Sequence, residues 1–97
     1  VRWLMRLVWS SRFIRELKRL SRRNPQLRPA IEQKLQLLAE EPFHPSLGTH
    51  KLKGDLSGIW SCSIDYSNRI LFEFVQNSES NEEEILLHTV GSHDDVY

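Results

Sequence analysis

The spacing of apolar residues changes along this chain, and the changes limit the folds that are open to it. Between residues 13 and 38, apolar side chains recur every three or four positions, which is the period of an amphipathic helix. Two stripes result, formed by Phe13, Ile14, Leu17 and Leu20 and then by Ile31, Leu35 and Leu38. Residues 50–53, 59–65, 69–76 and 84–90 read instead as strands.

The start of the chain predicts a further strand and the limits of the two helices. Residues 3–9 alternate, with Trp3, Met5, Leu7 and Trp9 on one side. Ser10 and Ser11 can cap the first helix, which we expect to end within residues 21–24. The second helix begins at Pro25 or Pro29, because proline suits a first helical turn. It ends near Glu41, since Pro42 disfavours helix before it.

This order of elements predicts an α+β fold. An N-terminal strand is followed by an antiparallel helical hairpin and then by three to four antiparallel strands. We expect the hairpin to pack on one face of a mostly antiparallel single sheet. A chain of 97 residues has room for one domain, 1–97, with one core.

Composition excludes several classes of protein. The one cysteine, Cys62, cannot form an internal disulfide, which favours a reducing, cytoplasmic location. It alternates with Trp60 and Ile64, so we expect a buried core thiol. No apolar run is long enough to span a membrane, and Arg2 and Arg6 interrupt the first nine residues, unlike the core of a signal peptide. Nucleotide-loop and zinc-ribbon motifs are absent, so no metal or cofactor is expected.

The net charge of zero conceals a strong asymmetry. Residues 1–54 contain twelve Lys or Arg and four Asp or Glu, a net charge of +8, whereas residues 55–97 contain one Arg and nine Asp or Glu, a net charge of −8. Such asymmetry predicts a polyanionic or acidic partner for the basic half. The alternative is that basic helices and acidic loops attract each other within the fold, and the sequence leaves both open.

Two of the four histidines stand at the edges of predicted elements. His50 opens the run His-Lys-Leu-Lys-Gly, and His93 lies in the final Gly-Ser-His-Asp-Asp-Val-Tyr. His44 is expected in a loop and His88 within a strand. From the residues alone, His50 and His93 are either surface residues or catalysts, because imidazole titrates near neutral pH.

The order of these motifs resembles the RelE/ParE superfamily of toxins. The resemblance rests on residues 50–54, Gly58, residues 69–72 and the ending 91–97, whose Gly-x-His-x-x-aliphatic-aromatic pattern is similar to the YafQ branch. It implies the toxin of a type II toxin–antitoxin system, held in check by a small antitoxin protein. It also implies a ribosome-dependent endoribonuclease that cuts mRNA without a metal, by attack of the ribose 2′-hydroxyl on the adjacent phosphate.

The resemblance assigns roles to six residues. His50 and His93 would be the catalytic pair, with the roles of general acid and base open to exchange. Arg69 would stabilise negative charge, and Tyr97 would stack on a base. Lys51 and Lys53 are two residues apart, so they are expected to share a strand face and hold phosphates of the RNA.

The sequence departs from the YafQ pattern between these motifs. Ser63 stands where that branch has a further histidine, and Ser67 or Asn68 stands where it has an aspartate. Asp65 is close enough in sequence to substitute as an auxiliary group. Two alternatives therefore stay open: a ParE-like toxin that poisons DNA gyrase, and an inactive relic that only binds its antitoxin.

Overall fold

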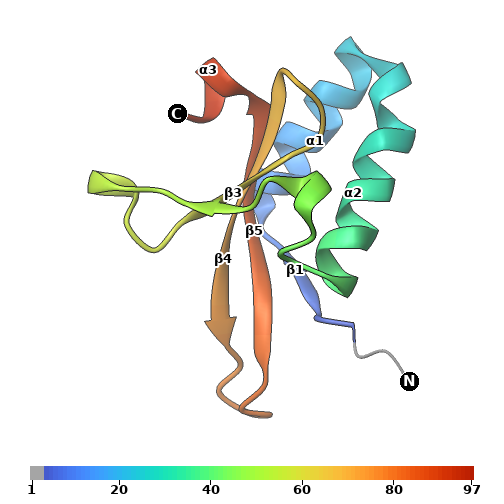
Figure 1. The fold of residues 1–97 in the computed structure, drawn as a ribbon. Helices are drawn as coiled ribbons and strands as arrows, with labels where there is room; N and C mark the ends of the chain where they lie inside the picture. The colour runs from blue at the N-terminus through green and yellow to red at the C-terminus, as the bar shows by residue number, and fades with distance from the viewer. Residues whose placement is uncertain (1–3) are drawn as a thin grey trace.

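The computed structural model describes residues 4–97 and has the predicted α+β architecture (Figure 1). Its helices are α1 (Ser11–Arg23), α2 (Arg28–Glu40) and the short α3 (His93–Val96). In the same described residues, 3₁₀ turns cover Pro25–Leu27, Pro45–Leu47 and Gly54–Leu56. Within the described range the strands are β1 (Leu7–Trp9), β2 (His50–Lys51), β3 (Trp60–Ser63), β4 (Asn68–Gln76) and β5 (Glu83–Ser92).

These strands form one sheet, in the order β1-β5-β4-β3-β2 over the described part of the chain. Strands β2 to β5 pair antiparallel, as expected, while β1 pairs parallel with β5, with Leu7 opposite Ile85. A parallel pair needs a crossover connection, and the intervening helical hairpin begins that crossover. The first and last strands of residues 4–97 are therefore neighbours in the sheet.

The helix limits follow from local chemistry. Ser10 caps α1, because its hydroxyl accepts a hydrogen bond from the Phe13 N–H at 3.0 Å. The sequence left two possible starts for the second helix, and the structure uses both prolines. Pro25 begins the first 3₁₀ turn, and Pro29 lies in the first turn of α2.

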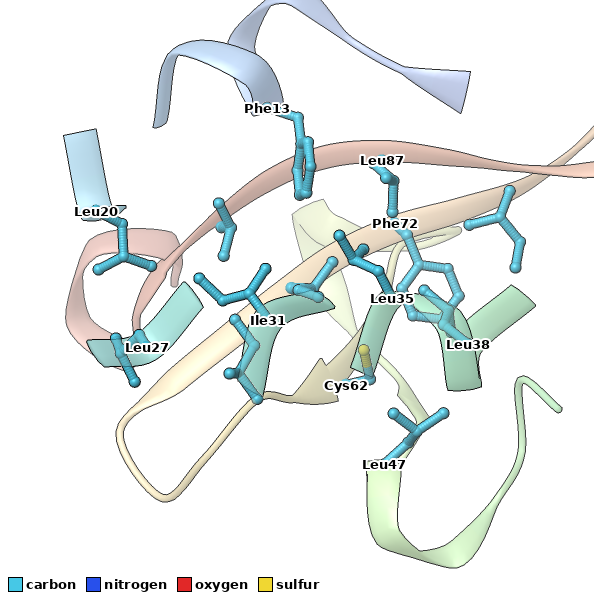
Figure 2. Close-up of a cluster of buried hydrophobic side chains, with 14 residues drawn as sticks. Phe13, Leu20, Leu27, Ile31, Leu35, Leu38, Leu47, Cys62, Phe72 and Leu87 are labelled. Carbon is cyan, nitrogen blue, oxygen red and sulfur yellow. The ribbon is translucent and has the colours of Figure 1, made fainter. Parts of the chain in front are cut away.

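The core lies between α1, α2 and one face of the sheet (Figure 2). Phe13 and Leu38 come from the helices, and Phe72 and Leu87 come from β4 and β5; all four are fully buried. Cys62 is also fully buried there, which confirms the expected core thiol, and burial raises its pKa to about 12. Such a thiol is protonated at neutral pH and is a poor nucleophile.

A bulge between β4 and β5 adjusts which side chains reach the core. Leu71 pairs with Thr89 and Phe72 with Leu87, so His88 is left without a ladder partner. Because of this extra residue, Leu87 and Val90 both point into the core although they are three positions apart. His88 instead forms a 2.9 Å contact between its Nε2 atom and the Glu73 carboxylate.

Two of the expected strands differ in length, and one helix was not expected. The first strand begins at Leu7, and Trp3, which was expected to belong to it, lies outside the described residues. The strand expected over 50–53 ends at Lys51, because the chain turns into 3₁₀ helix at Gly54, which has a φ of +69°. Helix α3 was not expected. No helix among residues 4–97 is both long and apolar enough to cross a membrane.

Candidate functional site

The sheet has a second face, turned away from α1 and α2, and the strand register identifies the side chains on it. Cys62 and Ile70 are paired and point into the core, so their neighbours Ser61 and Leu71 point to the other face. Ser61 also pairs with His50 on β2. Since directly opposed residues in a ladder share a face, His50 lies on this second face beside Ser61.

Helix α3 covers part of this second face. It packs on β4 and β5, on the opposite side of the sheet from α1 and α2 (Figure 1). This cover explains why Leu71 and Thr89 are each only 4% exposed although they point away from the main core. The C-terminal segment that carries His93 and Tyr97 is thus held against the face that carries His50.

A chain of contacts connects the two predicted catalytic histidines. The ring of His93 lies with its centroid 4.3 Å from that of Tyr97, in an edge-on arrangement. The Tyr97 hydroxyl donates a hydrogen bond of 2.5 Å to the Ser61 Oγ atom. Ser61 is the ladder partner of His50. The structure therefore places His50, Ser61, Tyr97 and His93 in succession over one face of the sheet.

The tautomer of His50 follows from its hydrogen bond. Its Nδ1 atom lies 2.9 Å from the carbonyl oxygen of Gly48, and a carbonyl can only accept. The proton of the neutral ring is therefore on Nδ1, and the lone pair is on Nε2. Because the side chain is exposed, Nε2 can accept a proton from a bound molecule.

His93 is anchored through its backbone rather than through its ring. Its N–H donates to the carbonyl of Ser67 at 3.0 Å, where α3 begins. The side chain is 61% exposed, and its Nδ1 atom lies 3.9 Å from Asp94 Oδ1. The imidazole is thus open to a substrate, and the Tyr97 ring packs against one side of it.

Asp65 and Arg69 hold the turn between β3 and β4. One carboxylate oxygen of Asp65 accepts hydrogen bonds from the backbone N–H groups of Ser67 and Asn68 and from the Asn68 side chain, at 2.8–3.0 Å. Arg69 donates to the carbonyls of Asp65 and Asn68 at 2.7 and 3.1 Å. The expected auxiliary carboxylate is therefore engaged in turn geometry.

The charged form of Asp65 is favoured in the fold. Desolvation, the largest single contribution, raises its pKa, but the hydrogen bonds from Asn68 and Ser67 and the charge of Arg69 together lower it. A carboxyl with a lowered pKa is ionised near neutral pH, so it has no proton to donate there.

The strand that was expected to place Lys51 and Lys53 on one face ends at Lys51. Lys51 is next to His50 on β2 and so points to the opposite face, where its Nζ atom lies 5.9 Å from the centroid of the Trp60 ring. Lys53 lies past the end of β2, at the start of a 3₁₀ turn. Lys51 and Lys53 could share a strand face only if the strand continued through residue 53, and β2 ends at Lys51. Contact of either lysine with RNA stays a prediction.

Sequence reasoning missed Gly48 and Ser61. Gly48 adopts a left-handed conformation, with φ +58°, and presents its carbonyl to His50. Its position in a turn-rich segment was evident from the sequence, but its hydrogen bond was not. Ser61 gave no signal, because its partner Tyr97 is 36 residues away along the chain.

A family model for a bacterial toxin of a type II toxin–antitoxin system, YafQ, matches residues 5–97. This chain belongs to the YafQ family of bacterial type II toxins. The resemblance seen in its motifs is confirmed at the level of the family. No curated sequence matches this YafQ-family chain.

Solved structures agree with the fold of a YafQ-family toxin. YafQ from E. coli superposes with a TM-score of 0.77 at 12% identity, over 96% of this chain and 98% of that one. A YoeB/ParE toxin from Agrobacterium tumefaciens superposes with a TM-score of 0.73 at 21% identity, over 92% of this chain and 99% of that one. The chain matched in the E. coli DinJ–YafQ complex superposes with a TM-score of 0.76 at 12% identity, over 96% of this chain and 98% of that one. At these identities the likeness is one of fold.

Proposed function

We propose that this YafQ-family toxin is a ribosome-dependent mRNA endoribonuclease that works without a metal. The observation that carries the proposal is the succession of His50, Ser61, Tyr97 and His93 over one open face of the sheet. Two imidazoles, one with a free Nε2 lone pair and both accessible, supply an acid and a base for RNA cleavage.

The reaction balances with these groups. One imidazole takes the proton of the ribose 2′-hydroxyl, and the oxygen attacks the adjacent phosphorus. The bond from phosphorus to the 5′-oxygen breaks, a 2′,3′-cyclic phosphate forms, and the second imidazole protonates the departing oxygen. His50 acts as the base through Nε2 and His93 as the acid, and the reverse assignment is also consistent with the geometry. Arg69, on the same face, would stabilise the charge on the phosphorane-like transition state.

The test is cleavage of mRNA in a translating extract by the purified toxin, with mapping of the cut ends. His50→Ala and His93→Ala should each lower the cleavage rate by about a hundredfold or more, because each removes a proton-transfer group. His88→Gln is the matched control: it changes a histidine of β5 that contacts Glu73 outside this succession, and it should cut at the rate of the unmodified toxin.

Three results would contradict the proposal. Intact messages beside accumulated broken DNA would favour a ParE-like gyrase poison. Unchanged cleavage in both alanine variants would remove the histidine pair from the mechanism. Binding of an antitoxin without any effect on RNA or DNA would indicate the inactive relic.

We also propose an acidic segment of an antitoxin as the protein partner. The related E. coli YafQ has been solved in a complex with DinJ. In this chain, a groove of about 620 Å³ runs between α1 and α2, and Trp9 and Ile14 beside it are 44% and 38% exposed. Lys18, Arg22 and Arg28 stand at the groove with one acid, Glu32. An amphipathic helix with acidic flanks would match both the apolar floor and the basic rim.

A further inference from the structure

Ser61 has an unusual environment for a serine. It is fully buried, yet it lies on the face of β3 that is turned away from the main core. A buried hydroxyl generally has a hydrogen-bond partner, because leaving one unpaired costs about 1–3 kcal/mol. The partner of Ser61 is the phenolic hydroxyl of Tyr97, just past the end of α3.

Helix α3 depends on contacts of this kind. It spans four residues, and a helix of that length has no stability of its own. At its start, the His93 N–H is bound to the Ser67 carbonyl, and at its end the Tyr97 side chain is bound to Ser61. The two bonds fix the two ends of the single turn that carries the His93 side chain.

The ring of His93 is otherwise weakly constrained. It is 61% exposed, and its contact with Asp94 is long, at 3.9 Å. The ring of Tyr97 packs edge-on against it at 4.3 Å and blocks rotation toward that side. The position of the imidazole therefore depends on where Tyr97 is held, and Tyr97 is held by Ser61.

We propose that Ser61 is a positioning residue for His93, which acts through Tyr97. This inference rests on the proposed nuclease function for its effect on rate. Ser61 is also the ladder partner of His50, so one residue of the rigid sheet relates the positions of both histidines. Displacement of a catalytic group by about 1 Å can cost on the order of a hundredfold in rate, so an anchor of this kind matters for catalysis.

The experiment compares Ser61→Ala, Tyr97→Phe and the double variant. Each single change removes one partner of the hydrogen bond and leaves the Tyr97 ring present, so each should lower kcat about tenfold with KM unchanged. The double variant should be no slower than either single variant, because the same interaction is lost only once. Tyr66→Phe is the control, since Tyr66 is 95% exposed, and it should keep full activity.

A second measurement does not depend on activity. With fluorinated tyrosine the chain gives two ¹⁹F resonances, and the exposed Tyr66 serves as an internal reference. Ser61→Ala should move the Tyr97 resonance toward that of Tyr66, with the unfolding midpoint still well above the assay temperature. Additive losses in the double variant, or a Tyr97 resonance that does not move, would overturn the inference.

The two proposals fail differently. If the unmodified toxin leaves RNA intact, the nuclease proposal fails, while the ¹⁹F shift still tests the anchoring of Tyr97. If the unmodified toxin cuts RNA and Ser61→Ala cuts equally fast, the positioning role fails and the nuclease proposal stands.

Discussion

His50 is oriented by one backbone carbonyl, and that carbonyl belongs to a residue in the left-handed region. Gly48 has φ +58°, which L side chains rarely adopt. A Cβ atom there would meet only the Ser63 hydroxyl, at an ordinary 3.7 Å, so the cost of a substitution lies in the backbone. Relief of that strain would turn the carbonyl away from the His50 ring.

Gly48→Ala should therefore affect both stability and cleavage. We expect a loss of about 1 kcal/mol in the free energy of unfolding, from the left-handed backbone. We also expect a drop in cleavage rate, because the Nδ1–carbonyl bond that sets the tautomer is weakened. Gly58→Ala is the matched control: Gly58 also has a positive φ, +90°, with open space at its Cβ position. Equal activity of the two variants in the extract assay would argue against a role for the Gly48 carbonyl.

The residues of the site could be only partly inferred from the sequence. His50, Arg69, His93 and Tyr97 were chosen by resemblance to a family, and the structure places them on one face of the sheet. Nothing in their spacing shows that β5 leads into a turn of helix that lies back over β4. Ser61 could not be found from local pattern, because an alternating serine between Trp60 and Cys62 is equally typical of an exposed strand position.

At the level of elements, the turn between β3 and β4 depends on one carboxylate. Asp65 accepts three hydrogen bonds within the turn, and these bonds favour its charged form. Because the pKa of Asp65 is lowered in the folded state, its contribution to stability is fully present above the ordinary aspartate pKa, roughly 3.9. That contribution is lost as the pH falls through the lowered value.

Asp65→Ala should lower the free energy of unfolding at pH 7 by about 1 kcal/mol, since the turn loses its acceptor. The difference from the unmodified protein should shrink in strong acid, where the carboxylate is protonated. Asp65→Asn keeps an acceptor oxygen and should retain most of the stability. Denaturant unfolding at several pH values measures the free energy of unfolding of each variant. A difference that grew on acidification would contradict the role of the charged form.

Helices and strands with a clear period were predictable, and the pairings between distant segments were not. Ser10 and the two prolines mark helix limits through local chemistry, which a sequence displays directly. The parallel pairing of β1 with β5 depends on partners almost eighty residues apart. Helix α3 has no apolar stripe of its own and exists through its bonds to Ser67 and Ser61.

At the scale of the whole molecule, the two charged halves are largely kept apart. Some basic residues of α1 and α2 form ion pairs with acids of their own helices, such as Arg19 with Glu16 and Arg28 with Glu32. Arg6 and Glu84 connect the two halves at 3.9 Å. The Arg28–Glu32 pair is exposed and the Arg19–Glu16 pair is partly exposed, so both contribute little to stability. Most of the positive field of α1 is therefore available to a partner.

Charge reversal at the groove should therefore weaken the antitoxin complex. We expect Lys18→Glu with Arg22→Glu to raise the Kd for the antitoxin at least about tenfold at low salt, and the difference should narrow as salt is added. Arg12→Glu with Arg23→Glu reverses the same number of charges on the same helix, away from the groove, and is the matched control. Calorimetric titration measures the Kd of each protein for the antitoxin at low and at high salt. Equal affinities for all three proteins would place the antitoxin elsewhere.

The interior position of β5, between β1 and β4, has a consequence for how the protein is made. Its residues, 83–92, pair with β1 on one side and with β4 on the other, and α1 packs on it. A ribosome delivers this strand after almost everything that it stabilises. Before β5 is synthesised, β1 has no strand to pair with, and Phe13 of α1 has no β5 to pack against. A nascent chain cut short before residue 83 cannot close its interior, so interrupted synthesis yields unfolded fragments for proteases rather than partly working toxin.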